Sequence, residues 1–266
     1  MNMPPHYRLR TLGDVDSTNA EAVRILQTHD DPPPTWITAS SQNSGRGRRG
    51  RKWNSPPGNL YATLLFRPHV SANIAPQLSL VASLAVRDMA ASFLQHGGGV
   101  TLKWPNDVLL DGKKLAGILL ETHQSDNNGG NVGWIAIGIG VNLIHFPLDS
   151  PYPATSLQQY CGKHPEPPEA LDALAWSMDA RLSGWNKGEG FERFRNEWTE
   201  HAYGIGEEVR VGLGGNNNEM RGTFLGLDNN GALRLRHEQG EQSLQAADVR
   251  FLRTRKLEQQ RASHAG

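Results

Sequence analysis

One segment of the sequence gathers positive charge and glycine at a spacing suited to binding phosphate groups. Residues 44–53 read Ser-Gly-Arg-Gly-Arg-Arg-Gly-Arg-Lys-Trp, with five cations between Arg46 and Lys52. Arginine donates paired hydrogen bonds to oxyanions and keeps its charge, and glycine lets the backbone approach an anion closely. The segment indicates a loop that binds a phosphate chain, although a solvated basic loop or an Arg/Gly RNA-binding segment would have the same composition.

The glycines of this loop match two nucleotide-binding patterns only in part. Gly45, Gly47 and Gly50 have the G-x-G-x-x-G spacing of a dinucleotide-binding loop, which must open a helix that holds the pyrophosphate. Two prolines and a glycine at 56–58 prevent such a helix. A P-loop needs Lys and then Ser or Thr at 51 and 52, where this chain has Arg and Lys. Both patterns are therefore excluded.

A lysine-rich hairpin is the second candidate for a binding site. Residues 103–107 read Lys-Trp-Pro-Asn-Asp, and Asp111-Gly112 is a strong signal for the turn that follows. Simple alternation along the returning strand places Lys114 on the face of residues 116, 118 and 120, which are apolar. An ammonium on an apolar face is costly unless it meets an anion. Lys114 is thus expected either to bind an anionic ligand or to reach solvent at the mouth of the hairpin.

The third candidate is an apolar strand that contains two glycines. Residues 134–142 read Trp-Ile-Ala-Ile-Gly-Ile-Gly-Val-Asn. Glycine inside a core strand implies the close approach of another backbone or of a ligand. Asn142 at the strand end could bind a base or cap a turn.

A polar segment near the N-terminus opens the first expected helix. It reads Asp16-Ser-Thr-Asn-Ala-Glu21, and apolar residues at helical spacing follow it. Thr18 and Glu21 have the spacing of a capping box. A capped helix start also presents hydroxyl and amide groups to a pocket, so the cap does not exclude a binding role.

Apolar periodicity predicts both helices and strands in the first 202 residues. Strands are expected at 7–11, 36–39, 60–66, 100–104, 108–110, 113–121 and 134–141, and helices at 18–26, 74–94 and in two pieces over 169–200. This pattern predicts an α+β domain with a mixed, mostly antiparallel sheet. Short strands between 209 and 252 predict a small β-barrel over 203–254, and residues 255–266 are expected to form a disordered tail.

The composition excludes several classes of protein. The 27 basic and 27 acidic side chains cancel, so net charge gives no sign of a nucleic-acid or membrane partner. A single cysteine, Cys161, excludes an intramolecular disulfide framework and a thiolate metal site, and is typical of a reducing cytoplasm. No apolar run has the length of a membrane span, and the first ten residues lack a signal-peptide core.

Five segments in this order resemble the biotin–protein ligase family. They are Asp16–Asn19, Gln42 with Gly45–Trp53, Lys103–Asp107, Lys114–Ile118 and Gly138–Asn142. The resemblance covers about residues 8–145 and extends more loosely to the later helices and the terminal module. It implies a catalytic domain over 1–202 like those of class II synthetases and lipoate ligases, followed by an SH3-like β-barrel over 203–254.

The resemblance also implies roles for individual residues. Lys114 and Arg48 would be the catalytic residues, with Lys114 contacting both the biotin carboxylate and the α-phosphate. The residues implied for biotin are Ser17, Thr18, Asn19, Gln42, Gly45, Arg46, Gly47, Arg48, Trp53, Lys114 and Gly117. Those implied for ATP and the adenylate are Arg46, Arg48, Arg49, Trp53, Asn106, Lys114 and Asn142. Asp107 would hold the magnesium ion.

The activity implied is activation of biotin by ATP and Mg²⁺ to biotinyl-5'-AMP, then transfer to a lysine of the biotin carboxyl carrier protein of acetyl-CoA carboxylase. The location implied is the cytoplasm, without a membrane or DNA partner and with a homodimer left open. Some members carry an N-terminal helix-turn-helix domain and act as repressors. Only 16 residues precede Ser17 here, so a ligase without repressor activity is expected.

Two rival functions have to be weighed. Lipoate and octanoate ligases or transferases share the catalytic fold, but the transferases use a cysteine nucleophile and Cys161 lies in a proline-rich loop. The Gly/Arg loop favours biotin over lipoate. An RNA-binding protein would need aromatic residues among the cations and a basic terminal module. Residues 203–254 have few aromatics and mixed charge, which argues against it.

Overall fold

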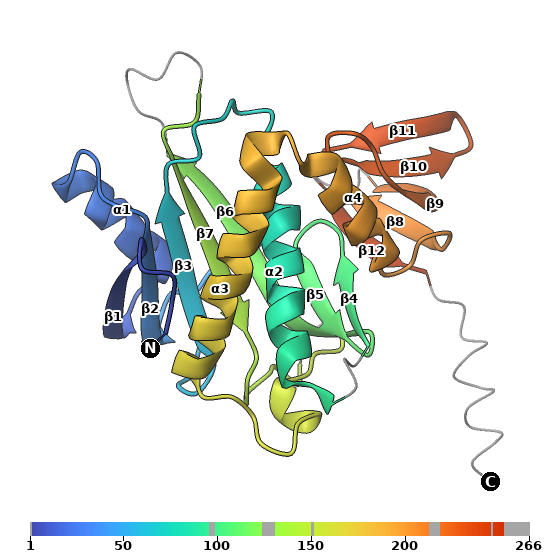
Figure 1. Ribbon diagram of the computed structural model, residues 1–266. Coiled ribbons are helices and arrows are strands. Elements are labelled where there is room, and N and C mark those ends of the chain that lie inside the picture. The colour runs from blue at the N-terminus through green and yellow to red at the C-terminus, as the bar shows by residue number, and fades with distance from the viewer. Residues whose placement is uncertain are drawn as a thin grey trace, which may run out of the picture.

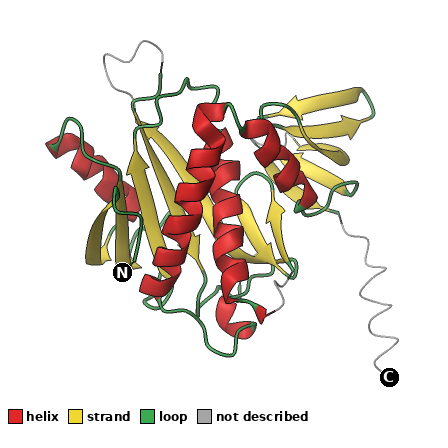
Figure 2. Cartoon of the chain, viewed as in Figure 1, coloured by secondary structure: helices red, strands yellow, loops and turns green. Residues whose placement is uncertain are grey.

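Two β-sheets with helices packed against them make up the chain (Figures 1 and 2). The computed structural model describes residues 2–95, 99–123, 131–149, 152–212, 219–245 and 247–252. The tail expected over 255–266 lies outside the described residues.

The larger sheet has seven strands in the order β1-β2-β3-β7-β6-β5-β4. They are β1 (Arg8–Val15), β2 (Thr35–Gln42), β3 (Leu60–Phe66), β4 (Val100–Lys103), β5 (Asp107–Leu110), β6 (Lys113–His123) and β7 (Trp134–Val141). The pair β1–β2 is parallel and the other neighbouring pairs are antiparallel. The expected mixed, mostly antiparallel sheet is therefore confirmed, and β3 and β7 have the predicted bounds.

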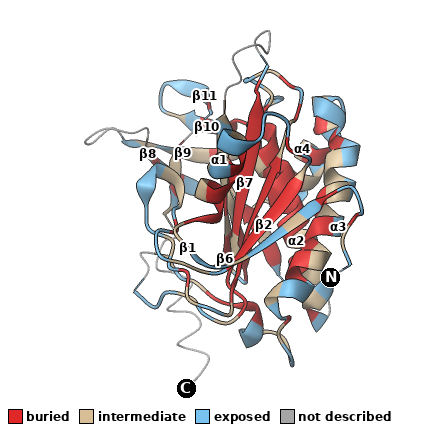
Figure 3. Ribbon diagram, turned by 90° about the vertical axis from the view of Figure 1, so that its left-hand side faces the viewer, coloured by how far each residue is buried: buried red, intermediate tan, exposed pale blue. Residues whose placement is uncertain are grey.

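The helices cover the two faces of this sheet unequally. The α-helices are α1 (Thr18–Thr28), α2 (Gln77–Phe93), α3 (Pro167–Trp185) and α4 (Phe191–Glu200), with short 3-10 segments η1 (Arg48–Gly50), η3 (Leu157–Gln159) and η4 (Asn186–Gly188). Figure 1 shows α2 and α3 side by side over one face and α1 on the other side, and Figure 3 shows the buried strands between them. None of the helices in the described ranges is long and apolar enough to cross a membrane.

The main apolar core lies under α2, because its buried side chains recur at helical spacing. Positions 78, 81, 84, 85 and 89 are buried, as the periodicity predicts. A smaller apolar cluster joins Ala22 and Ile25 of α1 to the opposite face of the sheet. That face is only partly covered, which leaves room beside α1 for a binding site.

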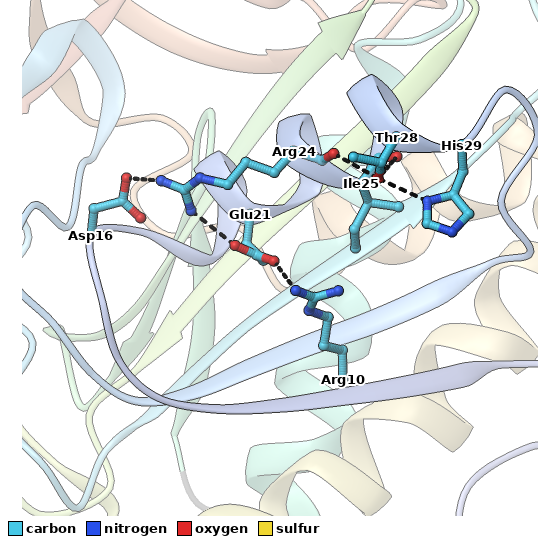
Figure 4. A network of polar contacts seen from close by, with 7 residues as sticks. All are labelled: Arg10, Asp16, Glu21, Arg24, Ile25, Thr28 and His29. Atoms are coloured by element: carbon cyan, nitrogen blue, oxygen red, sulfur yellow. Dashed lines mark hydrogen bonds and ion pairs between the residues drawn. The ribbon is translucent and has the colours of Figure 1, made fainter.

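The predicted capping box at the start of α1 is wrong. Ser17 is the N-cap residue and makes no side-chain cap hydrogen bond. Glu21 instead pairs with Arg24 (2.9 Å) and Arg10, as Figure 4 shows. Arg24 also pairs with Asp16 and lowers the pKa of that carboxyl. Long-range and same-face partners thus replace the local cap, and the first turn is left to contact a ligand.

A β-bulge corrects the expected direction of Lys114. Val108 pairs with Ala116 and Leu109 pairs with Lys114, so Leu115 is an extra residue in β6. An extra residue reverses the alternation of side chains beyond it. Lys114 therefore shares a face with Gly117 and not with Ala116, which lies in the main core.

The second sheet has five strands in the order β11-β10-β9-β8-β12. They are β8 (Glu208–Gly212), β9 (Glu219–Leu227), β10 (Leu233–His237), β11 (Gly240–Leu244) and β12 (Asp248–Phe251). The sequence reading missed β11, which is largely exposed and polar and so lacks the apolar alternation of a strand. The boundary at 202/203 and the SH3-like form of this module stay predictions.

Backbone and indole hydrogen bonds fix the second sheet to the edge of the first. The Leu102 N–H donates to His201 O (2.9 Å), and the Tyr203 N–H donates to Leu102 O (2.8 Å). The Trp104 indole donates to Gly231 O at 3.0 Å. One apolar core cluster also contains residues of both sheets. The edge of the second sheet is thereby held beside β4 and β5.

Leu84→Ala tests the core of α2. Leu84 is fully buried, so truncation should lower the free energy of unfolding by about 2–5 kcal/mol. The control is Leu148→Ala, because Leu148 is 86% exposed and should change that free energy by less than about 0.5 kcal/mol. Urea unfolding measures both, and equal effects would contradict this core.

Candidate active site

A cavity of about 370 Å³ opens on the face of the large sheet beside α1, a size typical of small-molecule sites. Its wall is formed by five segments of the first 142 residues, by residues 147, 149, 152 and 154, and by β12. The sequence-predicted residues that line it are Ser17, Thr18, Asn19, Gln42, Arg46, Gly47, Arg48, Trp53, Asn106, Asp107, Lys114, Gly117 and Asn142. Gly45 and Arg49 are not in the wall. The segments singled out by their residue types therefore converge on one cavity.

Glycines on the sheet make room for two side chains of the cavity. Gly117 and Gly140 are directly paired across β6 and β7. A Cβ on Gly140 would lie 2.6 Å from the Trp53 indole, and one on Gly117 would lie 3.2 Å from it. A Cβ on Gly138 would overlap the Asn19 side chain. These are the close approaches that glycine in a core strand predicts.

A neutral polar group forms one end of the cavity. Gln42 Oε1 accepts from the Thr18 N–H (2.9 Å) and the Thr18 hydroxyl (3.2 Å), and Gln42 Nε2 donates to Ser55 Oγ (3.0 Å). The Thr63 hydroxyl lies 2.8 Å from Thr18 Oγ1. Gly45 supports this end from behind, because a Cβ there would lie 2.6 Å from Ser55 Oγ. Gly45 therefore contributes to the site by close packing behind the wall and not by lining the cavity.

Two lysines approach the cavity from β4 and β6, the two strands that flank β5. Lys114 Nζ lies 2.7 Å from Asp107 Oδ1 and 5.3 Å from the centroid of the Trp53 ring. Lys103 pairs with Asp107 across β4 and β5, and its Nζ lies 4.2 Å over the Tyr152 ring. Burial lowers the pKa of Lys103, while nearby Asp107 opposes that shift. Lys103 received no role in the sequence reading, although its alternation with Leu102 already pointed it away from the core.

The basic loop folds back on itself at the mouth of the cavity. Arg46 and Lys52 form a β-bridge, and the Trp53 N–H donates to Gly45 O at 2.9 Å. Arg48 lines the cavity and donates to Ala247 O at 3.2 Å. Burial lowers the pKa of Arg48 from its ordinary value. Its charge is costly to bury without an anion nearby.

The second sheet contributes residues that sequence reasoning missed. Asp248 and Val249 of β12 line the cavity. Arg49 turns away from the cavity and donates to Asp248 Oδ2 at 2.9 Å. The basic loop and β12 lie far apart in the sequence, and no local pattern in residues 247–252 predicts this contact.

The two predicted asparagines each carry a structural hydrogen bond. Asn106 Nδ2 donates to Ile118 O at 2.7 Å, and Asn142 Nδ2 donates to Thr155 O at 3.0 Å. Both also line the cavity. Their backbone contacts tie the loops after β4 and β7 to the sheet and orient the amides.

The acidic residues of the cavity suit a metal ion only in the company of phosphates. In the described ranges, no three His, Cys, Asp or Glu side chains are grouped as a metal site. Asp107 is the carboxylate nearest to Lys114. Mg²⁺ commonly binds one or two carboxylates together with substrate phosphates and water. Asp107 therefore fits such an ion if a nucleotide brings it.

Comparison with family models gives two matches. Residues 13–142 match the Biotin/lipoate A/B protein ligase family, and residues 204–252 match the Biotin protein ligase C terminal domain. The first range contains the five segments that form most of the cavity wall. The second contains β12.

Curated relatives and a solved structure agree with these matches. The chain is 41% identical over 245 residues to a biotin–[acetyl-CoA-carboxylase] ligase of Paracoccus denitrificans, which covers 90% of this chain and 99% of the relative. It is 31% identical over 247 residues to the bifunctional ligase/repressor BirA of Bacillus subtilis, covering 89% and 72%. A biotin protein ligase from Aquifex aeolicus, solved in complex with biotin and ATP, is 28% identical with a TM-score of 0.76, covering 93% of this chain and 99% of that one.

Lys103→Met tests the cost of gathering cations at the cavity. Because burial lowers the pKa of Lys103, its charge destabilises the fold below its ordinary pKa of 10.5. The variant should gain free energy of unfolding at pH 7, by about 0.5–2 kcal/mol as for other stabilising surface-charge changes. Stability of the parent should rise as the pH increases toward 10.5, where the unfolded chain binds more protons, so the difference should shrink.

The matched control is Lys113→Met, since Lys113 is exposed on the same hairpin. Chemical unfolding at several pH values measures both variants. A difference between Lys103→Met and the parent that stays constant from pH 7 to 10 would show that the lysine charge is not the cause.

Proposed function

The chain belongs to the biotin–protein ligase family, and we propose that it activates biotin with ATP and transfers it to a lysine of the biotin carboxyl carrier protein of acetyl-CoA carboxylase. The relative from Paracoccus denitrificans is named for that carboxylase. The observation that carries the proposal is the convergence of cations from separate segments on one cavity whose other end is neutral and polar.

The neutral end suits the ring system of biotin. The ureido group both donates and accepts hydrogen bonds, and Ser17, Thr18 and Gln42 offer hydroxyl and amide groups at that end. The dithiolane ring of lipoate has no such groups, so the same residues would gain nothing from it. This supports biotin over lipoate as the substrate.

The cationic end suits the first reaction step. The carboxylate oxygen of biotin attacks the α-phosphorus of ATP, the bond to the pyrophosphate oxygen breaks, and pyrophosphate leaves. Two anions must meet, so fixed positive charge lowers the barrier. Lys114 and Arg48 lie in the wall where the carboxylate and α-phosphate would come together. Magnesium held by Asp107 would neutralise further phosphate charge.

The second step needs no nucleophile from the enzyme. The amine of the target lysine attacks the carbonyl carbon of the adenylate, an amide forms, and AMP leaves. Cys161 lies outside the cavity wall, donates to Phe93 O at 3.3 Å, and has a pKa raised by burial. This argues against the cysteine mechanism of the octanoate transferases.

The remaining alternatives lack support in the contacts. In the second sheet, Arg221 pairs with Glu208, and Arg234 and Arg236 pair with Glu241, so this module offers mixed charge and not a basic RNA-binding face. We place the reaction in the cytoplasm, as expected for a chain with a single thiol. The lack of repressor activity and the oligomeric state stay predictions.

Lys114→Ala should abolish ATP-dependent labelling of an acceptor lysine in a biotin carboxyl carrier domain. Losing this cation removes charge stabilisation from both anionic reactants and leaves Asp107 unpaired. The expected loss in kcat/KM is about 100-fold or more. Lys113→Ala is the control, because Lys113 is the exposed neighbour of Lys114 and its truncation should leave labelling unchanged. Near-normal turnover of Lys114→Ala would remove Lys114 from the site.

Arg48→Ala should release biotinyl-adenylate faster than the parent. A hydrogen bond to a charged group contributes about 1.5–3 kcal/mol, so the dissociation rate should rise by about 10- to 100-fold. Stopped-flow release of the preformed adenylate measures it, with Arg250→Ala as a control on the exposed side of β12. Unchanged retention of the adenylate would count against a loop that closes over the intermediate.

A further inference from the structure

We infer that Asp248 on β12 is a positioning residue, which holds the tip of the basic loop over the cavity. The inference rests on the proposed function for its catalytic consequence. It assigns the second sheet a task in that reaction, namely to anchor the loop that covers the phosphates.

Four contacts made by three arginines join the loop to one edge of the second sheet. The Asp248 carboxylate accepts from Arg49 Nη1 at 2.9 Å and from Arg51. Arg49 also donates to Gly212 O at 3.2 Å, and Arg48 donates to Ala247 O at 3.2 Å. Asp248 and Gly212 are paired across β12 and β8. The tip therefore binds a rigid, hydrogen-bonded pair of strands.

The backbone of the tip needs such an anchor. Arg49 has a φ of 56°, in the left-handed region that residues other than glycine rarely adopt. The loop closes on itself at its base, between Arg46 and Lys52, and at its tip, where the Gly47 N–H donates to Arg51 O at 2.7 Å and the Arg51 N–H donates to Arg48 O at 3.3 Å. Strained backbone persists where surrounding contacts over-determine it. Asp248 supplies two of these contacts from a distant part of the chain.

Anchoring divides the arginines of the loop into two groups. Arg49 and Arg51 share the Asp248 carboxylate, and of these two only Arg51 also lines the cavity, whereas Arg48 lines the cavity with a backbone carbonyl as its hydrogen-bond partner. Arg48 forms no ion pair within the described part of the chain, and the charges of Asp248 and Asp107 offset only part of the effect of burial on its pKa, so this guanidinium remains available for an anionic ligand. The alternative is that Asp248 competes with the ligand. Its carboxylate would then bind arginines that the nucleotide phosphates have to bind in its place.

The two roles predict opposite results for Asp248→Asn. If Asp248 is an anchor, losing its charge should free the tip of the loop. Trypsin should then cut the ligand-free protein between residues 46 and 52 at least about fivefold faster than it cuts the parent. Dissociation of biotinyl-adenylate should accelerate to a similar extent, with little change in kcat once the ligands saturate the site. Slower or unchanged cleavage, or a lower KM for ATP, would overturn the anchor.

Glu208→Gln is the matched control. Glu208 forms a bidentate pair with Arg221 at 2.6 and 2.7 Å on β8 of the same sheet, yet it does not touch the loop. This variant should leave the cleavage rate and adenylate release at the parent values. Asp248→Glu keeps the charge and should restore most of the protection. Equal cleavage of Asp248→Glu and Asp248→Asn would overturn the role of charge.

Arg51→Gln tests the same contact from the side of the loop. Because Arg51 itself lines the cavity, its measure is trypsin cleavage after the remaining cations of the loop in the ligand-free protein, which should be faster than in the parent. Unchanged cleavage would overturn the anchor even if Asp248→Asn folds poorly by its thermal midpoint. Proteolysis of ligand-free protein does not depend on the reaction. If the parent enzyme fails to label the carrier lysine, the proposed function is refuted. The cleavage rates would still decide the role of Asp248.

Discussion

Compensation of positive charge is the constraint on which the rest of the site depends. Cations drawn from the basic loop and the hairpin lie in a half-buried cavity, where each would destabilise the fold if left unpaired. Carboxylates from three different elements meet them. Asp107 pairs with Lys114, Glu121 lies 3.6 Å from Arg46, and Asp248 pairs with Arg51. The site is thus assembled by ion pairs that anionic substrates can extend or replace.

The second requirement of the site is a sheet surface without side chains at its glycines. These positions let side chains from the basic loop and from α1 pack directly on the strands. Gly117 and Gly140 admit the Trp53 indole, which in turn lies 5.3 Å beneath the Lys114 ammonium. Gly138 admits Asn19 in the same way, and Asn19 donates to Glu121 at 2.7 Å. The glycines therefore set the depth of the cavity as well as the positions of the charged groups around it.

Local patterns predicted much of this arrangement, and long-range contacts account for what they missed. The apolar runs of β3 and β7 and the Asp-Gly turn before β6 needed no tertiary information. The bulge at Leu115 has no local signature, so alternation gave Lys114 the wrong face. The capping box failed because the Thr18 hydroxyl bonds Gln42, 24 residues away. The contribution of β12 depends on contacts nearly 200 residues apart, which no motif records.

The same distinction explains why residue type alone could not assign the arginines. Arg48 and Arg49 are neighbours with identical chemistry, yet one lines the cavity and the other binds Asp248. The left-handed backbone at Arg49 sends consecutive side chains in different directions, so the second sheet can hold one while the cavity receives the other. On the proposed function, the loop both binds an anionic ligand and is held in place by Asp248. The arginines of residues 46–52 would then serve two binding partners, one of which is the protein itself.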